Sequence, residues 1–443
     1  MPSAQLAKAA LVLSLAACTA PWMVTSACAQ PGSQPAAKPK AKPAPRAAQA
    51  APRPAASPAA NPDTRGFLYG RLTSRGGTVY EGRLRWGKEE AFWGDLFHSN
   101  KAKNPYFDQL PEKDRREARR IEVFGVPIGV HWEEHQTRQF AVRFGDIRKI
   151  EPRRGGEVVV LLKSGSRHEL SGGSNDVGNP VTVWDRSLGQ VEVDWDDIAS
   201  IEFLPAPNRL AVGAHRLYGT VKTRDGEFRG FLQWDQDECL STDELDGEAR
   251  DGNLSIPLGK VRAIERHQLS RADVTLRDGR TLTMSGTNDV NGDNRGIYVD
   301  DARFGRVLVS WEAFQRVDFL PPPGSGPAYT DYQPGRPLRG KVTARDGKVY
   351  SGRLVYDADE AETIEFLDGD RNEISYAIPF ARVAFLLPEP GGTTRVILKD
   401  GNELKLEETV DVSDDNAGVL VYANGQGKPR HIAWKDVRRI DFE

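Results

Sequence analysis

The sequence predicts an all-β protein made of three tandem pairs of small five-stranded units, six half-units in all. Three observations predict this fold. Two kinds of hairpin segment alternate along the chain, Gly-containing turns join their strands, and one apolar spacing closes every half-unit. Recurrence at a regular interval is typical of repeat architectures, so the repeats define the expected domain organisation.

The two hairpin segments each occur three times. The first kind, which opens the A half of each repeat, reads LYGRLTSRGGTVYEGRLRW at 68–86, LYGTVKTRDGEFRGFLQW at 217–234 and LRGKVTARDGKVYSGRLVY at 338–356. The second kind, which opens each B half, reads VVLLKSGSRHEL at 159–170, VTLRDGRTLTM at 274–284 and VILKDGNELKL at 396–406. Alternating apolar residues predict strands, and Asp-Gly pairs predict tight turns because Gly accepts a positive φ.

Apolar residues at spacings of 3, 3 and 2 close each half-unit. In the B halves they are Trp195, Ile198, Ile201 and Phe203; Trp311, Phe314, Val317 and Phe319; and Trp434, Val437, Ile440 and Phe442. The A halves keep the first three positions as Phe144, Ile147 and Ile150; Leu258, Val261 and Ile264; and Phe380, Val383 and Leu386. A spacing of 3 predicts a 3₁₀ turn, and the final step of 2 predicts a strand. We therefore expect the three recurring Trp residues in the core.

The B half at 273–320 gives the most complete strand prediction. Its strands are DVTLR, TLTMS, GIYVD, RVLVSW and RVDFL, with a 3₁₀ turn before the last. A Gly inside the second strand of each A half would permit a sharp bend: Gly82, Gly230 and Gly352. Five such strands resemble small SH3-like or Sm-like β-barrels, over most of 65–443. The resemblance is architectural and carries no functional motif, because such barrels host many functions.

Proline-bearing segments mark the expected boundaries. Leu204-Pro205 and Leu320-Pro321 follow two closing strands, and because proline interrupts a sheet we predict separate pairs rather than one continuous array. The predicted organisation is a signal peptide at 1–29, a disordered Pro/Ala/Lys linker at 30–64, barrel pair 1 at 65–205 with an insertion near 99–138, a linker at 206–216, barrel pair 2 at 217–320, a linker at 321–337 and barrel pair 3 at 338–443.

The first 29 residues are typical of a bacterial export signal. Lys8 precedes the apolar run AALVLSLAA, which is too short to span a bilayer stably. Two processing routes are open. Cleavage after Ala27-Cys28-Ala29 would release a periplasmic protein, whereas Leu15-Ala16-Ala17-Cys18 resembles a lipobox that would make an outer-membrane lipoprotein lipidated on Cys18. We expect the protein to contact a membrane only through that N-terminal lipid anchor.

The charge distribution argues against a nucleic-acid partner. All 63 acidic residues follow residue 62, whereas the preceding segment holds six of the 60 basic residues and no acid. An acidic body lacks the cationic face that displaces counterions from phosphates.

The loop SGTNDVNGDNRG at 285–296 is a candidate calcium site. Asp289, Asn291 and Asp293 match positions 1, 3 and 5 of a calcium loop, and Asp300 falls at position 12. Asn294 stands where such a loop has Gly. The third repeat keeps Asp411, Ser413 and Asp415 but has Tyr422 at position 12, and in the first repeat Pro180 and a shorter loop remove the site. The residues that persist best are Asp-Val and, in two copies, Asp-Asn-x-Gly. Those shared residues also suit a purely loop-shaping role, since Asp and Asn cap turns.

The sequence offers little support for metal-dependent or nucleophilic catalysis. The segment His131-Trp132-Glu133-Glu134-His135 matches a zinc-hydrolase pattern, but that pattern needs a helix and its neighbours predict strand and turn. No nucleophile-elbow, phosphate-loop or dinucleotide motif occurs in the sequence. Cleavage before Gln30 leaves Cys239 as a lone cysteine, which we expect to be a buried apolar residue.

The sequence therefore predicts an exported, non-enzymatic bacterial envelope protein that acts as an interaction or scaffold module and binds a protein partner in the envelope. The first alternative is a glycan- or calcium-binding protein that uses the Asp/Asn loops of the B halves. The second alternative is a metal-dependent hydrolase that uses the insertion at 99–138. No catalytic or cofactor-binding residues are predicted.

Overall fold

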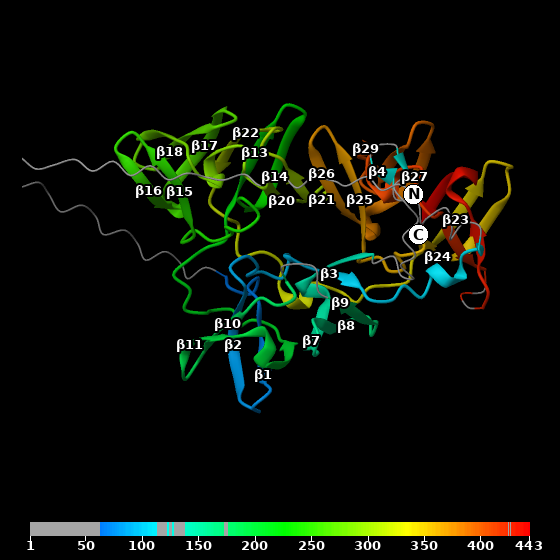
Figure 1. Cartoon of the computed structure of the whole chain (residues 1–443), viewed down its shortest axis with the longest axis horizontal. Helices are drawn as coiled ribbons and strands as arrows, with labels where there is room; N and C mark the ends of the chain where they lie inside the picture. The colour runs from blue at the N-terminus through cyan, green and yellow to red at the C-terminus, as the bar shows by residue number, and fades with distance from the viewer. Residues whose placement is uncertain are drawn as a thin grey trace, which may run out of the picture. The chain divides into compact units, whose positions relative to one another are not determined.

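The computed structural model describes residues 63–112, 122–123, 126–127, 138–171, 176–423, 425 and 427–443, and all of them belong to one compact unit, Pro58–Glu443. The predicted signal peptide and the segment with His131 and His135 lie outside the described residues. The all-β class is confirmed: antiparallel strands alternate with short 3₁₀ turns (Figure 1). Within the described part, no helix has the length and apolar character required to cross a membrane.

Repeat 1, the pair at 65–205, contributes one ten-stranded sheet. Its strands are β1 (Tyr69–Ser74), β2 (Val79–Trp86), β3 (Leu96–Lys101), β6 (Gln139–Arg143), β7 (Ile147–Pro152), β8 (Glu157–Leu162), β9 (Arg167–Ser171), β10 (Val181–Asp185), β11 (Gly189–Val193) and β12 (Ile198–Phe203). They are ordered β11-β10-β2-β1-β12-β7-β8-β9-β3-β6. In the insertion, β4 (Glu122–Val123) and β5 (Val126–Pro127) form a separate pair.

Repeats 2 and 3, the pairs at 217–320 and 338–443, follow the same strand pattern. Repeat 2 has β13 (Tyr218–Thr223), β14 (Gly226–Gln233), β15 (Glu244–Ala249), β16 (Gly252–Pro257), β17 (Val261–Gln268), β18 (Arg271–Leu276), β19 (Thr281–Met284), β20 (Ile297–Asp301), β21 (Gly305–Val309) and β22 (Phe314–Phe319). Repeat 3 has β23 (Arg339–Ala344), β24 (Val349–Tyr356), β25 (Phe366–Arg371), β26 (Ile374–Pro379), β27 (Val383–Glu389), β28 (Thr393–Leu398), β29 (Glu403–Leu406), β30 (Val419–Tyr422), β31 (Arg430–Ile432) and β32 (Val437–Phe442).

The A and B halves of each repeat exchange their opening hairpins. In repeat 1, the β1–β2 hairpin of the A half pairs with β10 and β12 of the B half, while the β8–β9 hairpin of the B half pairs with β7 and β3 of the A half. Repeats 2 and 3 show the corresponding exchange of β13–β14 and β23–β24. All five strands predicted in 273–320 are present, but a half-unit of five consecutive strands is not confirmed. The strand orders also leave each sheet with two open ends, so closed barrels are not confirmed either.

The physical reason is that the two halves have similar strands. An alternating pattern determines which face of a strand is buried, because a one-residue slip would expose the apolar side chains. It does not determine which of two similar copies supplies the neighbouring strand, and an exchange between identical elements conserves nearly all the contacts.

A sheet also continues from repeat 2 into repeat 3. Strand β21 pairs with β26 from Arg306–Ala377 to Val309–Ile374, so the two repeats share a ten-stranded sheet (Figure 1). The expectation that prolines would keep the pairs in separate sheets is wrong at this boundary. The sheet continues because two edge strands, β21 and β26, pair with each other. The proline-bearing linker at 321–337 contributes no strand to this sheet.

That linker, 321–337, packs against repeat 1. Its 3₁₀ turn, Tyr329–Asp331, places the Tyr329 ring 4.6 Å from the Trp93 ring, and the Tyr329 hydroxyl donates to the Ile147 carbonyl at 2.9 Å. The Lys163 ammonium donates to the carbonyls of Tyr329 and Tyr332 at 2.5 Å and 3.1 Å. The segment therefore joins the repeats rather than merely separating them.

The closing pattern forms a 3₁₀ turn as predicted in five half-units, but the 3₁₀ turn predicted before the last strand of 273–320 is an i to i+4 turn instead. In five half-units its first residue begins a 3₁₀ turn that leads into the closing strand; in the sixth, the Phe314 N–H closes a turn on the Ser310 carbonyl at 2.9 Å. All six first residues are buried: Phe144, Trp195, Leu258, Trp311, Phe380 and Trp434. The Trp residues at this position thus lie in the core, as expected.

The predicted Gly positions in the A halves mark close approaches between backbones. A Cβ on Gly82 would lie 2.0 Å from the Trp184 carbonyl oxygen, one on Gly230 would lie 2.0 Å from that of Asp300, and one on Gly352 would lie 2.2 Å from that of Tyr422. These contacts join β2 to β10, β14 to β20 and β24 to β30, which are the pairings created by the exchange. Gly is required there because any side chain would separate the strands.

Candidate functional site

The most distinctive polar structure is a pair of loops that meets in every repeat. The A loop follows the second strand of the A half, at 87–95, 235–243 and 357–365. The B loop precedes the third strand of the B half, and its described residues are 176–180, 286–296 and 407–418. Because the hairpin exchange brings the second A strand beside the third B strand, the two loops lie together three times in the chain.

An Asp of the B loop ties the two loops in each repeat. Its backbone carbonyl accepts a hydrogen bond from the last aromatic residue of the A strand: Trp86 to Asp176 at 2.8 Å, Trp234 to Asp289 at 3.0 Å, and the Tyr356 hydroxyl to Asp411. Its carboxylate accepts from the backbone N–H of the third A strand: His98, Asp246 and Asp368, at 2.5 Å, 2.6 Å and 2.8 Å. This double role explains why Asp-Val recurs in all three B loops.

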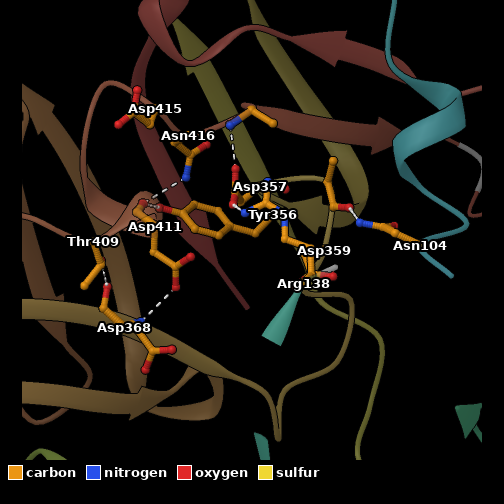
Figure 2. A network of polar contacts seen from close by, with 12 residues as sticks. Asn104, Arg138, Tyr356, Asp357, Asp359, Asp368, Thr409, Asp411, Asp415 and Asn416 are labelled. Carbon is orange, nitrogen blue, oxygen red and sulfur yellow. Dashed lines mark hydrogen bonds and ion pairs between the residues drawn. The ribbon is translucent and has the colours of Figure 1, made fainter. Parts of the chain in front are cut away.

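Repeat 3 shows the complete network (Figure 2). The Asp411 carbonyl accepts from the Asn416 side chain at 2.8 Å as well as from Tyr356, and the Thr409 hydroxyl donates to the Asp368 carbonyl at 2.6 Å. On the other side of Tyr356, Asp357 is paired with Arg138, with 2.7 Å between Nη1 and Oδ2. Burial raises the pKa of Asp411 well above its usual range, and the carboxyl of Asp368 adds to the effect.

A second acidic position shapes the A loop. The Asp95 carboxylate accepts from the N–H groups of Ala91 and Phe92, both at 2.9 Å. Asp243 and Glu365 occupy the same position in the other repeats and accept from the corresponding N–H groups. A carboxylate that accepts two backbone donors stabilises a tight loop, so we assign this position a structural role.

A third acidic position has no such partner. Glu90, Glu238 and Glu360 are equivalent, and the Oε2 atom of each is buried without a hydrogen bond. Burial raises the pKa of Glu238 to about 9, and it raises the pKa values of Glu90 and Glu360 well above the usual range. Nearby Asp carboxyls contribute to all three of these raised pKa values, including Asp176 for Glu90, Asp289 for Glu238 and Asp411 for Glu360.

Cationic side chains occupy this acidic environment in repeats 2 and 3. Arg295 pairs with Asp235 and Asp237 in repeat 2. In repeat 3 the cations come from repeat 1: Arg138 pairs with Asp357, and the buried Lys101 ammonium lies 2.8 Å from Asp359 Oδ1 and 3.3 Å from Glu365 Oε1.

Repeat 1 differs from both. Gly87 stands where the other A loops have Asp235 and Asp357, so one acidic group is missing. Glu89, Glu90 and Asp176 each offer an oxygen, and the three oxygens lie within 4.8 Å of one another. Among the described residues, no ion pair joins Glu89 or Glu90 to a Lys or Arg.

The structure gives separate partners to the four residues of the predicted calcium loop. Asp289 is the buried tie between the loops, and Asn291 and Asp293 are hydrogen-bonded to each other at 2.8 Å and 3.3 Å. Asp300 lies on β20, where Oδ2 is 2.7 Å from Arg216 and Oδ1 is 3.4 Å from Arg306. An ion shared by all four would have to displace both guanidinium groups from Asp300. The calcium loop stays a prediction, and its contacts favour the loop-shaping role.

Arg216 lies at the junction of repeats 1 and 2. Its side chain is 4% exposed, and Nη2 lies 2.9 Å from Asp95 Oδ1 in repeat 1 and 2.7 Å from Asp300 Oδ2 in repeat 2. The guanidinium also stacks on Phe92 and Phe231, with its carbon 4.4 Å and 4.5 Å from the ring centres. One cation thus binds carboxylates of two repeats.

Two cavities lie at the junctions between repeats. One, of about 180 Å³, is lined by His98, Lys101 and Phe140 of repeat 1 and by Glu360 and Phe366 of repeat 3. The other, of about 430 Å³, is lined by residues that include Arg143, Arg216, Asp300, Tyr332 and Arg382. Both are formed by residues that hold the repeats together.

Cys239 is buried, as expected, and its sulfur donates to the Glu89 carbonyl at 3.3 Å. Burial raises the pKa of this thiol well above its usual range. A thiol that resists ionisation is a poor nucleophile, so the position favours a packing role.

Sequence reasoning missed the unpaired glutamates and the cations between repeats. An alignment of the three A loops could have found the first, because Glu90, Glu238 and Glu360 fall four residues after the last aromatic residue of the preceding strand. No signal in the sequence identifies Lys101, Arg138 or Arg216, since each pairs with residues far away along the chain.

Comparisons with known proteins assign neither a family nor a function to this chain. No protein-family profile matches the chain, and a search of curated proteins gives no match. Among solved structures, one described as "Streptogramin B lyase structure" aligns at 12% identity, covers 68% of this chain and 94% of that chain, and has a TM-score of 0.11. A TM-score this low does not show a shared fold, so the alignment carries no argument.

Proposed function

We propose that this protein is an exported, non-enzymatic scaffold of the bacterial envelope that binds a partner protein along an open sheet edge. The pairing of β21 with β26 supports the proposal, because it shows that this type of edge accepts a further strand. In each repeat, the opening hairpin of one half and the three later strands of the other half would form a small five-stranded SH3-like unit. These units would present their sheet edges and loops to partners.

Strand β11 of repeat 1 is the edge that fits this role. It occupies the position that β21 has in repeat 2, and within the described part of the chain it pairs only with β10. Gly189, Gln190 and Glu192 of β11 are exposed, and the preceding Leu188 is 65% exposed. An exposed strand edge beside an exposed apolar side chain suits the addition of an extended segment from a partner.

The proposal can be tested with two neighbouring proline substitutions in β11. Along an antiparallel edge, successive N–H groups alternate between the paired side and the open side. One of Gln190→Pro and Val191→Pro therefore removes a donor from the open side, and that variant should keep the wild-type melting temperature.

The variant that keeps its stability should lose a partner that wild type captures from envelope extracts, as measured by affinity capture and mass spectrometry. Glu403→Pro, on the edge strand β29, is the matched control and should retain the partner if it remains folded. Equal capture by the stable β11 variant and wild type would contradict binding at this edge.

A further inference from the structure

We propose that repeat 1 binds a divalent, oxygen-preferring cation between Glu89, Glu90 and Asp176. This inference does not depend on the scaffold function. It concerns a different set of residues from the loop Asp289, Asn291, Asp293 and Asp300, with which the sequence predicts a calcium site.

The geometry of the three carboxylates fits such an ion. Their nearest oxygens lie within 4.8 Å of one another. Three points at that spacing share a centre no more than about 2.8 Å from each, close to the 2.3–2.6 Å of calcium–oxygen bonds. A site made of carboxylates alone suits hard cations such as Ca²⁺, Mg²⁺ and Mn²⁺, whereas imidazole and thiolate ligands are typical of Zn²⁺ and Cu⁺ sites.

The unpaired atom of Glu90 is an independent indication. Glu90 is 5% exposed, and its Oε2 atom has no hydrogen-bond partner. A buried carboxyl oxygen left without a donor is costly, and a coordinated cation would satisfy it. Of the three equivalent glutamates with an unpaired Oε2 atom, only Glu90 belongs to such a three-carboxylate group among the described residues.

The other repeats give a second indication. Their equivalent loops hold a cation already: the Arg295 guanidinium in repeat 2, and the Arg138 and Lys101 side chains in repeat 3. The same acid-rich loop pair therefore occurs twice with positive charge bound to it. In repeat 1, Arg216 and Arg306 pair with Asp95 of the A loop. Among the described residues no Lys or Arg pairs with Glu89, the equivalent of Asp237 and Asp359, and a metal ion would supply the positive charge that Arg295 and Lys101 supply there.

The surrounding charges do not oppose an ion. Arg306 and Arg295 act electrostatically on Glu90 and Glu89, but Arg306 pairs with Asp300 and Asp95, and Arg295 pairs with Asp235 and Asp237. Asp237 also approaches Glu89 and adds negative charge there. His98 lies beside Asp176, with 3.4 Å between Nδ1 and Oδ2.

Terbium luminescence can report this site in the full-length protein without its signal peptide. The Trp86 ring donates to the Asp176 carbonyl at 2.8 Å, so excited tryptophan lies close enough to transfer energy to a bound Tb³⁺ ion. After treatment with a chelator, Tb³⁺ should give a saturable signal of one ion per chain. Separate additions of Ca²⁺, Mg²⁺ and Mn²⁺ should compete with it, and calorimetry should measure the affinity of each.

Three variants distinguish this site from others. Glu90→Gln and Glu89→Gln keep the side-chain shape and should weaken binding about tenfold or more, because each removes a charged ligand. Glu238→Gln, the same change at the equivalent position of repeat 2, should leave the affinity unchanged. Far-UV circular dichroism establishes that each variant folds.

Two results would overturn the inference. One is no saturable binding of any of the three divalent ions up to about 10 mM, well above the range of weak extracellular calcium sites. The other is binding that survives both Glu90→Gln and Glu89→Gln but is lost in Asp289→Asn with Asp293→Asn. That outcome would assign the ion to the B loop of repeat 2.

Discussion

At the scale of single residues, the repeats use acidic groups in distinct ways. Asp176 and its equivalents tie two loops through backbone hydrogen bonds, and Asp95 and its equivalents shape one loop. Glu90, Glu238 and Glu360 each have a buried Oε2 atom without a hydrogen-bond partner. Such a carboxyl favours the protonated form, because desolvation penalises its charge.

The contribution of these glutamates to the free energy of unfolding should therefore fall as the pH rises. The pKa of Glu238 is raised to about 9 in the folded protein, so above its unfolded pKa the unfolded chain ionises first. Stability attributable to this group is lost progressively between pH of about 4.5 and 9. Glu238→Gln, which mimics the protonated acid, should gain roughly 1–2 kcal/mol over wild type at pH 8 and little at pH 4.

Urea denaturation of both proteins at the two pH values measures this difference. The exposed Glu227→Gln in the same repeat is the matched control and should follow wild type. A gain for Glu238→Gln that is the same at both pH values would show that burial of the charge is not its cause.

At the scale of elements, the exchanged hairpins depend on close backbone approach. Strand β14 reaches β20 through Gly230, where a Cβ would lie 2.0 Å from the Asp300 carbonyl oxygen. Backbone atoms cannot move aside as a flexible side chain can. The strand pair must separate to admit a methyl group, and this would disturb the hydrogen bonds and the packing on both sides.

Gly230→Ala should therefore destabilise the protein by roughly 2–4 kcal/mol, measured as a fall in the midpoint of chemical denaturation. Gly213→Ala is the control: nothing lies within 4 Å of its added Cβ, and its stability should match wild type within about 0.5 kcal/mol. Similar stabilities for the two variants would contradict the close approach of β14 and β20.

At the scale of the whole molecule, buried cations connect the repeats. Arg216 joins Asp95 of repeat 1 to Asp300 of repeat 2, and Lys101 of repeat 1 binds Asp359 and Glu365 of repeat 3. The β21–β26 pairing joins repeats 2 and 3 directly. Every repeat thus contacts the other two, and we expect the three repeats to unfold together.

Replacing Arg216 should break that coupling. Arg216→Met leaves Asp95 and Asp300 without their shared partner and should cost roughly 3–5 kcal/mol, because a buried ion pair is broken from one side. Calorimetry should then resolve more than one transition, with faster proteolysis near the 206–216 linker.

Arg316→Met is the control for this prediction, since Arg316 makes a more exposed pair with Glu265 and Asp318. It should cost at most about 1 kcal/mol. A single transition in Arg216→Met, at an unchanged temperature, would show that Arg216 does not couple the repeats.

The sequence by itself determined the strands and turns of the six opening hairpins, the five strands of 273–320 and the buried face of the closing strands. The 3-3-2 spacing placed six core positions correctly, and Asp-Val in the B loops marked residues that prove to be structural ties. These features are local: they depend on the alternation of side chains and on turn chemistry, both of which a short segment carries.

Only the tertiary structure decided which strands pair and which acids meet. The A and B halves are alike, so local pattern permits either partner for a hairpin, and the exchange is settled by packing of the whole repeat. The group of Glu89, Glu90 and Asp176 exists because that exchange brings an A loop to a B loop more than 80 residues away. Lys101, Arg138 and Arg216 find their carboxylates across repeats, where no spacing in the sequence records the contact.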